Sequence, residues 1–164
     1  MLLNLAQLLG TVGGHRAALA GFVAALERDP PPRIALPAWG GVATSASHLG
    51  ERRITRRAAT RIDQVATGPG LQYARAAALA EAALALERID VDASSWRRSA
   101  MALAEEYRFN EISFRLAADA PTPSGTPTPS APRAHSYPRV TRTSTAVILA
   151  VDALVDVRSS RVLA

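Results

Sequence analysis

The sequence SSWRRSAMALAEEYRFNEISFRLAA, from Ser94 to Ala118, holds half of the aromatic residues in the chain. On a helix of 3.6 residues per turn, its large apolar side chains fall on two roughly opposite sides. The first set is Trp96, Leu103, Tyr107 and Phe114, and the second is Met101, Phe109, Ile112 and Leu116. A helix that is apolar on two sides is normally covered on both, so the pattern predicts the central helix of an all-helical body. Ser94 and Ser95 are the predicted N-cap residues, and the prolines from Pro121 onward end the helix.

The composition supports the same fold class. Hydrophobic residues make up 48% of the 164 residues, which is enough for a core, but only 5% are aromatic and alanine is abundant. Alanine is the best helix former and is depleted in strands, so an alanine-rich, aromatic-poor core favours closely packed helices over a sheet. We therefore expect a helical bundle or a short helical-hairpin array.

The residue types present exclude several kinds of chemistry. All 19 basic residues are arginine, and the chain has neither lysine nor cysteine. A Walker A loop, a Schiff-base lysine, a thiol nucleophile and a thiolate zinc site are therefore ruled out. His15, His48 and His135 lie far apart in sequence and form no H-E-x-x-H motif. We predict no catalytic residues, no metal site and no cofactor. An enzyme would require a pocket in which a histidine and a carboxylate converge.

The first thirty residues read as two short helices, at about 2–9 and 15–28, joined by a glycine-rich turn. The stretch GGHRAALAGFVAALERDP carries glycine before the helix, small Ala18, then Phe22 and closing Pro30. This stretch resembles the second half of a tetratricopeptide repeat. Four residues fit the first-helix positions of that repeat, namely Leu2, Leu5, Ala6 and Leu9. The resemblance implies a helical-hairpin packing style of the kind that binds peptides. The alternative is a generic alanine-rich hairpin, since no second copy follows at the spacing of the repeat.

The next segment, PPRIALPAWGGVA at 31–43, is interrupted by proline and glycine and is predicted to be a connection. Trp39 is expected to cover the edge of the core. A helix is then predicted from about Ser45 to Val65, with an apolar face of Ile54, Ala58, Ile62 and Val65. Its opposite face carries Arg52, Arg53, Arg56 and Arg57, with Arg61 at the border. A solvated basic face and a site for an anionic partner, such as the phosphates of a nucleic acid, are both compatible with this pattern.

A turn at 67–70 leads to a further predicted helix at about 71–89, whose surface is rich in alanine. In the stretch 94–118 the carboxylates Glu105, Glu106 and Glu111 are interspersed with arginines. The first two are consecutive and therefore about 100° apart around the axis, so they cannot both point into one site. We interpret these carboxylates as part of a mixed-charge surface.

Residues 119–139 hold six of the eleven prolines together with serine, threonine and glycine. This composition predicts a disordered, partly polyproline linker. Residues 140–164 form a C-terminal apolar segment. As a helix, the segment presents a continuous apolar stripe. That stripe consists of Val147, Ile148, Val151, Leu154 and Val155. As a strand, Val151, Ala153, Val155 and Val157 alternate with other residues. The helix is favoured, because no other segment offers a partner for a strand.

The predicted organisation is a helical domain at 1–118, the linker at 119–139 and the amphipathic segment at 140–164. The leading functional hypothesis is a non-enzymatic protein-protein interaction or regulatory protein, with a protein partner bound through helical surfaces and through the apolar stripe of the C-terminal segment. The alternative is a nucleic-acid-associated protein that binds phosphates through the arginine-rich helix face, consistent with the net charge of +5. No apolar stretch reaches the roughly 20 residues of a membrane span, and we expect a cytoplasmic protein.

Overall fold

The structure is a computed structural model, and residues 2–118 are described. This part of the chain contains seven α-helices and no strand, which confirms the all-α prediction. The helices are α1 (Leu2–Thr11), α2 (His15–Leu26), α3 (Pro32–His48), α4 (Arg52–Gln64), α5 (Gln72–Arg88), α6 (Ser94–Tyr107) and α7 (Asn110–Ala118). None of the helices in this part of the chain combines the length and the apolar character that a membrane span requires. The predicted linker at 119–139 and the apolar segment at 140–164 lie outside the described residues.

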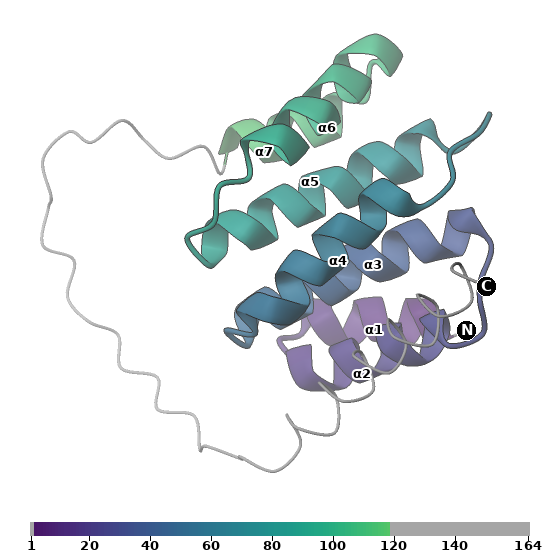
Figure 1. Cartoon of the computed structure of the whole chain (residues 1–164), viewed down its shortest axis with the longest axis vertical. Coiled ribbons are helices and arrows are strands. Elements are labelled where there is room, and N and C mark those ends of the chain that lie inside the picture. Colours follow the sequence, from purple (N-terminus) through teal and green to yellow (C-terminus); the bar gives the residue numbers. More distant parts are fainter. Residues whose placement is uncertain (1, 119–164) are drawn as a thin grey trace, which may run out of the picture.

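The helices stack in chain order, with α1 and α2 at one end, α3 and α4 in the middle, and α5 followed by α6 and α7 at the other end (Figure 1). Each helix packs against the next one in sequence, and α3 also packs closely against α5. Contacts between α3 and α5 follow the same order along both helices, because Thr44 contacts Glu81 and Ser47 contacts Arg88. The helices α3 and α5 therefore run parallel, with α4 returning between them. The result is an array of helical hairpins.

The N-terminal hairpin forms as predicted. α1 and α2 lie side by side, and a methyl group built onto Gly21 would stand 2.9 Å from the Cβ atom of Ala6. That short distance shows how closely the two helices approach. On the other side of the hairpin, Leu19, Phe22 and Leu26 are buried. The second helix ends at Leu26, two residues earlier than expected, and Asp29 has a left-handed backbone.

The segment 31–43 was predicted to be a connection, and this prediction is wrong. It forms most of α3, which begins with Pro32 in the first turn and contains Pro37 in its interior. Proline fits the first turn of a helix because the amide there has no partner within the helix. Burial outweighs the unfavourable interior proline and glycines, since Leu36, Trp39 and Val42 are all buried in the core. Trp39 is a core residue with 4% exposure and does not merely cover an edge.

Glycine explains where α3 ends and α4 begins. The helix predicted from Ser45 to Val65 is divided, because residues 49–51 separate α3 from α4 and Gly50 adopts a φ of +74°. This left-handed conformation suits glycine and interrupts a helix. The predicted apolar face is confirmed within α4, where Ile54, Ala58 and Ile62 are buried. The predicted turn at 67–70 and the helix that follows it are also present.

The stretch 94–118 is neither one helix nor central. It is split into α6 and α7 at Arg108, whose φ is +60°, and it lies at the end of the stack (Figure 1). Only Ala100, Ala104, Ile112 and Leu116 of these helices are buried. Tyr107 is 43% exposed and Phe114 is 75% exposed. The first predicted apolar side is therefore covered only in part, because Trp96 and Leu103 are half-buried against the core whereas Tyr107 and Phe114 are exposed. The core centres instead on α3 and α5, whose alanines allow close helix contact.

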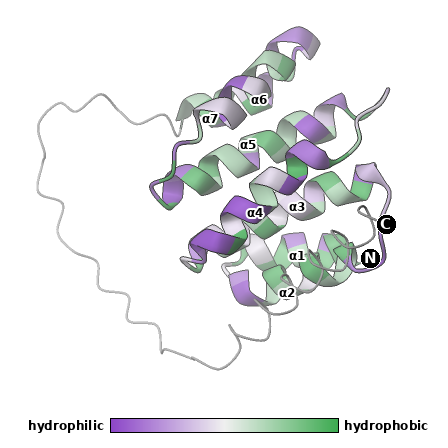
Figure 2. Cartoon of the chain, in the orientation of Figure 1, coloured by the Kyte–Doolittle hydropathy of each residue, from purple (hydrophilic) through white to green (hydrophobic). Residues whose placement is uncertain are grey.

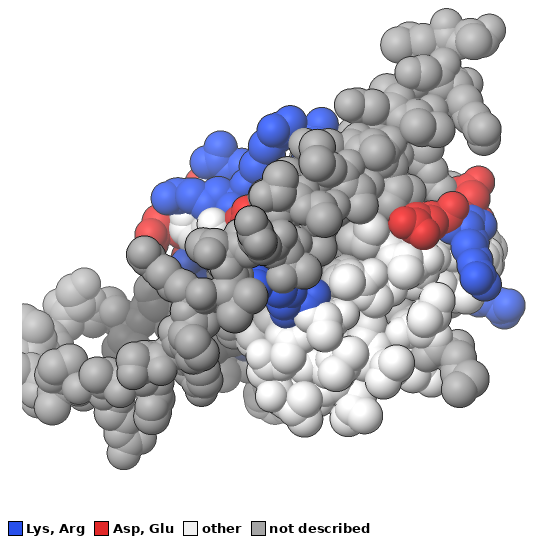
Figure 3. Space-filling model, turned by 90° about the horizontal axis from the view of Figure 1, so that it is seen from below, with Lys and Arg blue, Asp and Glu red and all other residues white. Residues whose placement is uncertain are grey.

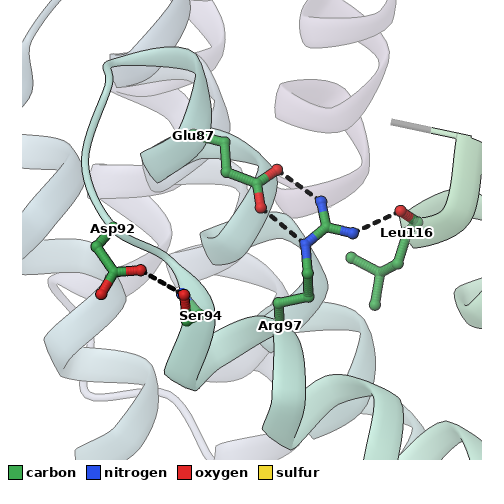
Figure 4. Close-up of polar contacts among 5 residues, drawn as sticks. All are labelled: Glu87, Asp92, Ser94, Arg97 and Leu116. Carbon is green, nitrogen blue, oxygen red and sulfur yellow. Dashed lines mark hydrogen bonds and ion pairs between the residues drawn. The ribbon is translucent and has the colours of Figure 1, made fainter. Parts of the chain in front are cut away.

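Polar contacts hold α6 and α7 against α5 (Figure 4). The Nε and Nη2 atoms of Arg97 donate to the two carboxylate oxygens of Glu87 at 2.7 and 2.6 Å. Its Nη1 atom donates to the carbonyl oxygen of Leu116 at 2.6 Å. The start of α6 also differs from the prediction, because the N-cap position is Ala93 and Ser94 is already helical. The Oδ1 atom of Asp92 accepts bonds from the amide of Ser94 at 3.0 Å and from its hydroxyl at 2.5 Å.

Candidate functional site: an apolar groove and a basic helix face

A groove of about 500 Å³ runs between α3 and α5 and is closed at one side by α1 and α2. We call it the α3–α5 groove. Its wall on α3 comes from Pro37, Gly41, Thr44, Ser45 and His48. Its wall on α5 comes from Tyr73, Ala74, Ala77, Ala78 and Glu81. On each helix these residues recur at helical spacing on one face, so the parallel packing of α3 and α5 builds the groove.

Glycine and alanine make room for the groove. A methyl group on Gly41 would lie 2.3 Å from the ring of Phe22, so the ring packs directly on the backbone of α3. Phe22 is buried and forms part of the groove wall. The alanines at 74, 77 and 78 leave the opposite wall shallow. Most of the groove surface is therefore apolar, although Gln7 and Thr11 of α1 and polar side chains of α2, α3 and α5 also line it. An apolar surface with polar groups placed in it is the usual composition of a binding site.

Glu81 is the carboxylate of the groove, and it already has two partners. The hydroxyl of Thr44 donates a short hydrogen bond to its Oε2 atom. The guanidinium of Arg115, on α7, lies 3.0 Å from its Oε1 atom. These contacts hold the carboxylate against the wall and offset its charge. The groove therefore offers little attraction to a further cation at this position.

Two histidines stand at one end of the groove, where α2 begins and α3 ends. The rings of His15 and His48 are stacked, with centroids 3.9 Å apart and planes inclined by 3°. The Nδ1 atom of His15 is buried and has no hydrogen-bond partner. Burial, followed by the nearby positive charge of Arg88, lowers the pKa of both histidines below the ordinary value of 6.5, and the His15 ring adds to the effect on His48. Neutral imidazoles are therefore favoured, and they extend the uncharged lining.

The structure brings histidines and a carboxylate into one groove, which the sequence could not show. Within residues 2–118, however, no hydrogen bond joins His15 or His48 to Glu81 or to Thr44, whereas an activated nucleophile needs such a bond to its base. The same residues contain no group of three or more histidine or acidic side chains that could hold a metal ion. The arrangement is suited to holding an apolar group beside neutral polar side chains.

The five arginines predicted as an anion site lie on α4, which Figure 2 draws mainly in the hydrophilic colour. They surround a shallow depression of about 620 Å³ together with Thr60 and Gln64. Arg52, Arg53 and Arg56 are exposed, whereas Arg57 and Arg61 are half-buried. We call this surface the α4 arginine face. None of these residues lines the α3–α5 groove, so the molecule has two separate candidate surfaces.

Other polar groups help to place the α4 arginine face. The Nη2 atom of Arg52 lies 3.5 Å from the carbonyl oxygen of Asp90, and the Nη1 atom of Arg61 donates to the side chain of Gln64 at 2.8 Å. Seen from the side of α1 and α2, uncharged residues fill the lower centre of the described surface, with charged groups to the left and to the right of them (Figure 3). α1 contributes no charge to this area, because its sequence has no charged residue.

The remaining predicted site residues have two outcomes. Glu105, Glu106 and Glu111 are exposed, as a mixed-charge surface requires. The apolar stripe of the C-terminal segment lies outside the described residues. That stripe is Val147, Ile148, Val151, Leu154 and Val155.

Sequence reasoning missed the α3–α5 groove, since it treated 31–43 as a connection. The spacing of Pro37, Gly41, Thr44 and His48 would have revealed one helical face if that segment had been recognised as a helix.

Comparisons with protein-family models, with curated proteins and with solved structures give no match to this chain.

Proposed function

We propose that this protein is a non-enzymatic interaction protein that binds a segment of a protein partner in the α3–α5 groove. The observation that carries the proposal is the groove itself, a channel between parallel helices whose surface is mostly apolar and whose carboxylate, Glu81, is already paired. Helical arrays offer such channels to extended or helical peptides, whose apolar side chains supply the binding energy. The resemblance of the first hairpin to a tetratricopeptide unit agrees with this packing style.

The polar groups of the groove also favour an apolar ligand. Glu81 is paired with Arg115, and the two histidines are neutral at physiological pH by the direction of their pKa shifts. A charged ligand would lose hydration without gaining an unpaired counter-charge, whereas an aliphatic side chain loses little. The cytoplasmic location expected from the sequence is part of the same proposal.

Photo-crosslinking in the native cell tests the proposal. A photoreactive phenylalanine replaces Tyr73, which is half-exposed in the groove wall, and in a second sample replaces Phe114, which is exposed outside the groove. We expect a discrete protein adduct at position 73 and none at position 114. Ala74→Arg, which fills the groove, should remove the adduct, whereas the matched change Ala102→Arg on the exposed side of α6 should leave it. Equal adducts at both positions, or an adduct insensitive to Ala74→Arg, would contradict groove binding.

The second candidate function is nucleic-acid binding by the α4 arginine face. The observation in its favour is that five guanidinium groups of this one helix line the same depression. A guanidinium group can donate two parallel hydrogen bonds to the oxygens of one phosphate. Neutralising the phosphates also releases the counterions that surround the nucleic acid. Neighbouring like charges on the helix cost roughly 0.2–0.5 kcal/mol per pair, an expense that an anionic partner would offset. Among residues 2–118 no aromatic side chain lines the depression, so stacking on bases is not part of this proposal.

Gel retardation at several salt concentrations tests the second function. Duplex DNA or RNA should be retarded at low salt. For DNA, a plot of the logarithm of the affinity against the logarithm of the salt concentration should fall with a slope of about 0.9 for each neutralised phosphate. A variant with glutamine at all five positions should lose retardation. The change Arg28→Gln, at an exposed arginine outside this face, is the control. Retardation that survives the five substitutions would eliminate the α4 arginine face as the site.

A further inference from the structure

The last described helix brings the chain close to the α3–α5 groove. Arg115 on α7 reaches α5, where its Nη1 atom pairs with Glu81 at 3.0 Å and its Nη2 atom lies 3.5 Å from the carbonyl oxygen of Ala77. Both Glu81 and Ala77 belong to the groove wall. The described chain ends at Ala118, three residues after Arg115. Three residues of helix advance the chain by only about 4.5 Å, so the chain continues from a point beside the groove.

The length of the chain beyond Ala118 allows a return to the groove. Residues 119–139 include six prolines, and an extended chain of this composition spans roughly 60 Å. This reach exceeds the distance needed, because neighbouring helices are separated by about 8–10 Å and α7 already packs on α5. A segment tethered in this way has an effective concentration in the millimolar range, so even a weak contact would be occupied much of the time.

The sequence after residue 139 has the chemistry that the groove accepts. In a helix its apolar stripe consists of branched aliphatic residues, with Asp152 and Asp156 away from the centre of the stripe. The groove offers alanines, a proline, the Phe22 ring and neutral histidines beside other uncharged polar side chains. Glu81, the carboxylate among its described lining residues, already has partners. A volume of about 500 Å³ suits a few aliphatic side chains rather than a large domain.

We propose that residues 147–155 of the same chain occupy the α3–α5 groove, through Val147, Ile148, Val151, Leu154 and Val155. This inference rests on the proposed function and specifies a resident occupant of that groove. An external partner would then have to displace the C-terminal segment before it could bind. The groove would be self-occupied in the isolated protein and would open to partners that compete with the segment.

Photo-crosslinking of the purified full-length protein tests this inference. The photoreactive residue again replaces Tyr73, and the crosslinked peptides are mapped by mass spectrometry. We expect an intramolecular crosslink between position 73 and residues 147–155. The double change Val151→Asp and Leu154→Asp should reduce the crosslink by at least about tenfold, since each change replaces a buried aliphatic side chain with a charged group. The change Asp152→Asn lies off the stripe and should leave the crosslink unchanged.

The other occupants give distinguishable results. A crosslink that joins two copies, identified by mixing isotopically labelled and unlabelled protein, would overturn the intramolecular contact in favour of exchange between copies. A purified protein without a crosslink to residues 147–155, combined with a partner adduct in the cell, would overturn this inference and leave the proposed function standing. Absence of both crosslinks would overturn both proposals.

Hydrogen exchange gives a second readout that does not require the photoreactive residue. In the full-length protein, the double change Val151→Asp and Leu154→Asp should increase exchange of the amides around Ala74 to Glu81 and around His15, since these line the groove. Asp152→Asn should not. Unchanged exchange in these regions in the double variant would overturn the inference.

Discussion

Arg97 binds Glu87 through two parallel hydrogen bonds, from Nε to Oε1 at 2.7 Å and from Nη2 to Oε2 at 2.6 Å (Figure 4). The side chains are 23% and 31% exposed, so water screens the ion pair only in part. The same guanidinium donates its third bond to the carbonyl of Leu116. One side chain on α6 therefore joins the end of α5 to α7. This contact fixes the position from which the chain leaves the described body.

We predict that Arg97→Met destabilises the protein by about 2 kcal/mol, since methionine retains the aliphatic stem but leaves Glu87 without its bidentate partner. Glu87→Gln should cost less, because the amide oxygen can still accept one bond. In a double-mutant cycle measured by urea unfolding, the two changes should be coupled by about 1 kcal/mol. The matched change Arg98→Met, at an exposed position on the same helix, should alter stability by less than about 0.5 kcal/mol. Additive effects of the two changes would show that the pair contributes nothing.

A second prediction concerns Gly41 and Phe22. Gly41→Ala gains helix propensity of up to about 1 kcal/mol, but the added methyl group would stand 2.3 Å from the buried ring. Overpacking of this kind costs about 1–3 kcal/mol, so we expect net destabilisation. Phe22→Leu frees space, and the double variant should therefore be more stable than the sum of the single effects predicts.

The control for this cycle is Gly10→Ala in α1, where the added methyl would meet only the Cβ atom of Ala18 at an ordinary 3.8 Å. That change should be neutral or stabilising in the same thermal or urea unfolding experiment. If Gly41→Ala also stabilises the protein, the close approach of Phe22 to α3 is not a constraint on the fold.

The same glycine shows why the sequence misled us about α3. Pro37, Gly40 and Gly41 are turn residues in most contexts, and local propensity predicts a connection. In the folded protein these glycines allow Phe22 and α5 to approach the backbone of α3. The stabilisation comes from contacts with residues distant in sequence, which a local pattern does not contain. Periodicity succeeded for α4 and for the N-terminal hairpin, where apolar spacing and helix ends agree.

The error over 94–118 has a different cause. Periodicity carried past Arg108 would place Phe114 in line with Trp96, but the left-handed residue at 108 breaks the helix and leaves Phe114 exposed. Arginine is not a typical residue for that conformation, so no local signal marked the break. The groove was missed for a related reason. Its histidines come from α2 and α3, thirty-three positions apart in sequence, and only packing brings their rings together.

A third prediction concerns the dependence of stability on pH. His15 and His48 have lowered pKa values in the folded protein, so below pH 6.5 the unfolded chain binds more protons than the folded one. The contribution of these residues is therefore fully present above pH 6.5 and is lost as the pH falls through their folded pKa values. The free energy of unfolding, measured with urea, should decrease between about pH 7.5 and about pH 5.5.

The double variant His15→Gln and His48→Gln provides the control for this dependence. It should show a smaller decrease over the same range. Asp63 acts in the opposite direction, because burial raises its pKa, but its contribution is common to both proteins and cancels in the comparison. An equal pH dependence in the wild type and the double variant would contradict a role for the stacked pair.

A fourth prediction separates the effect of the α4 arginine face on stability from its effect on nucleic-acid binding. Arg52 is the first residue of α4, which has no acidic residue in its first turn. Arg52→Glu would place a negative charge at the positive end of the helix dipole and replace the repulsion with Arg56 by an attraction at i, i+4. We expect stabilisation by about 0.5–1.5 kcal/mol, reduced slightly by loss of the long contact with the carbonyl of Asp90. Arg52→Gln, which removes the charge without reversing it, should give a smaller gain in the same unfolding experiment.

If the α4 arginine face also binds nucleic acid, Arg52→Glu should weaken gel retardation while it raises the free energy of unfolding. The positive charge at position 52 would then favour binding and disfavour folding. A loss of stability in Arg52→Glu would mean that the local charge on α4 is already balanced and that the face carries no electrostatic cost.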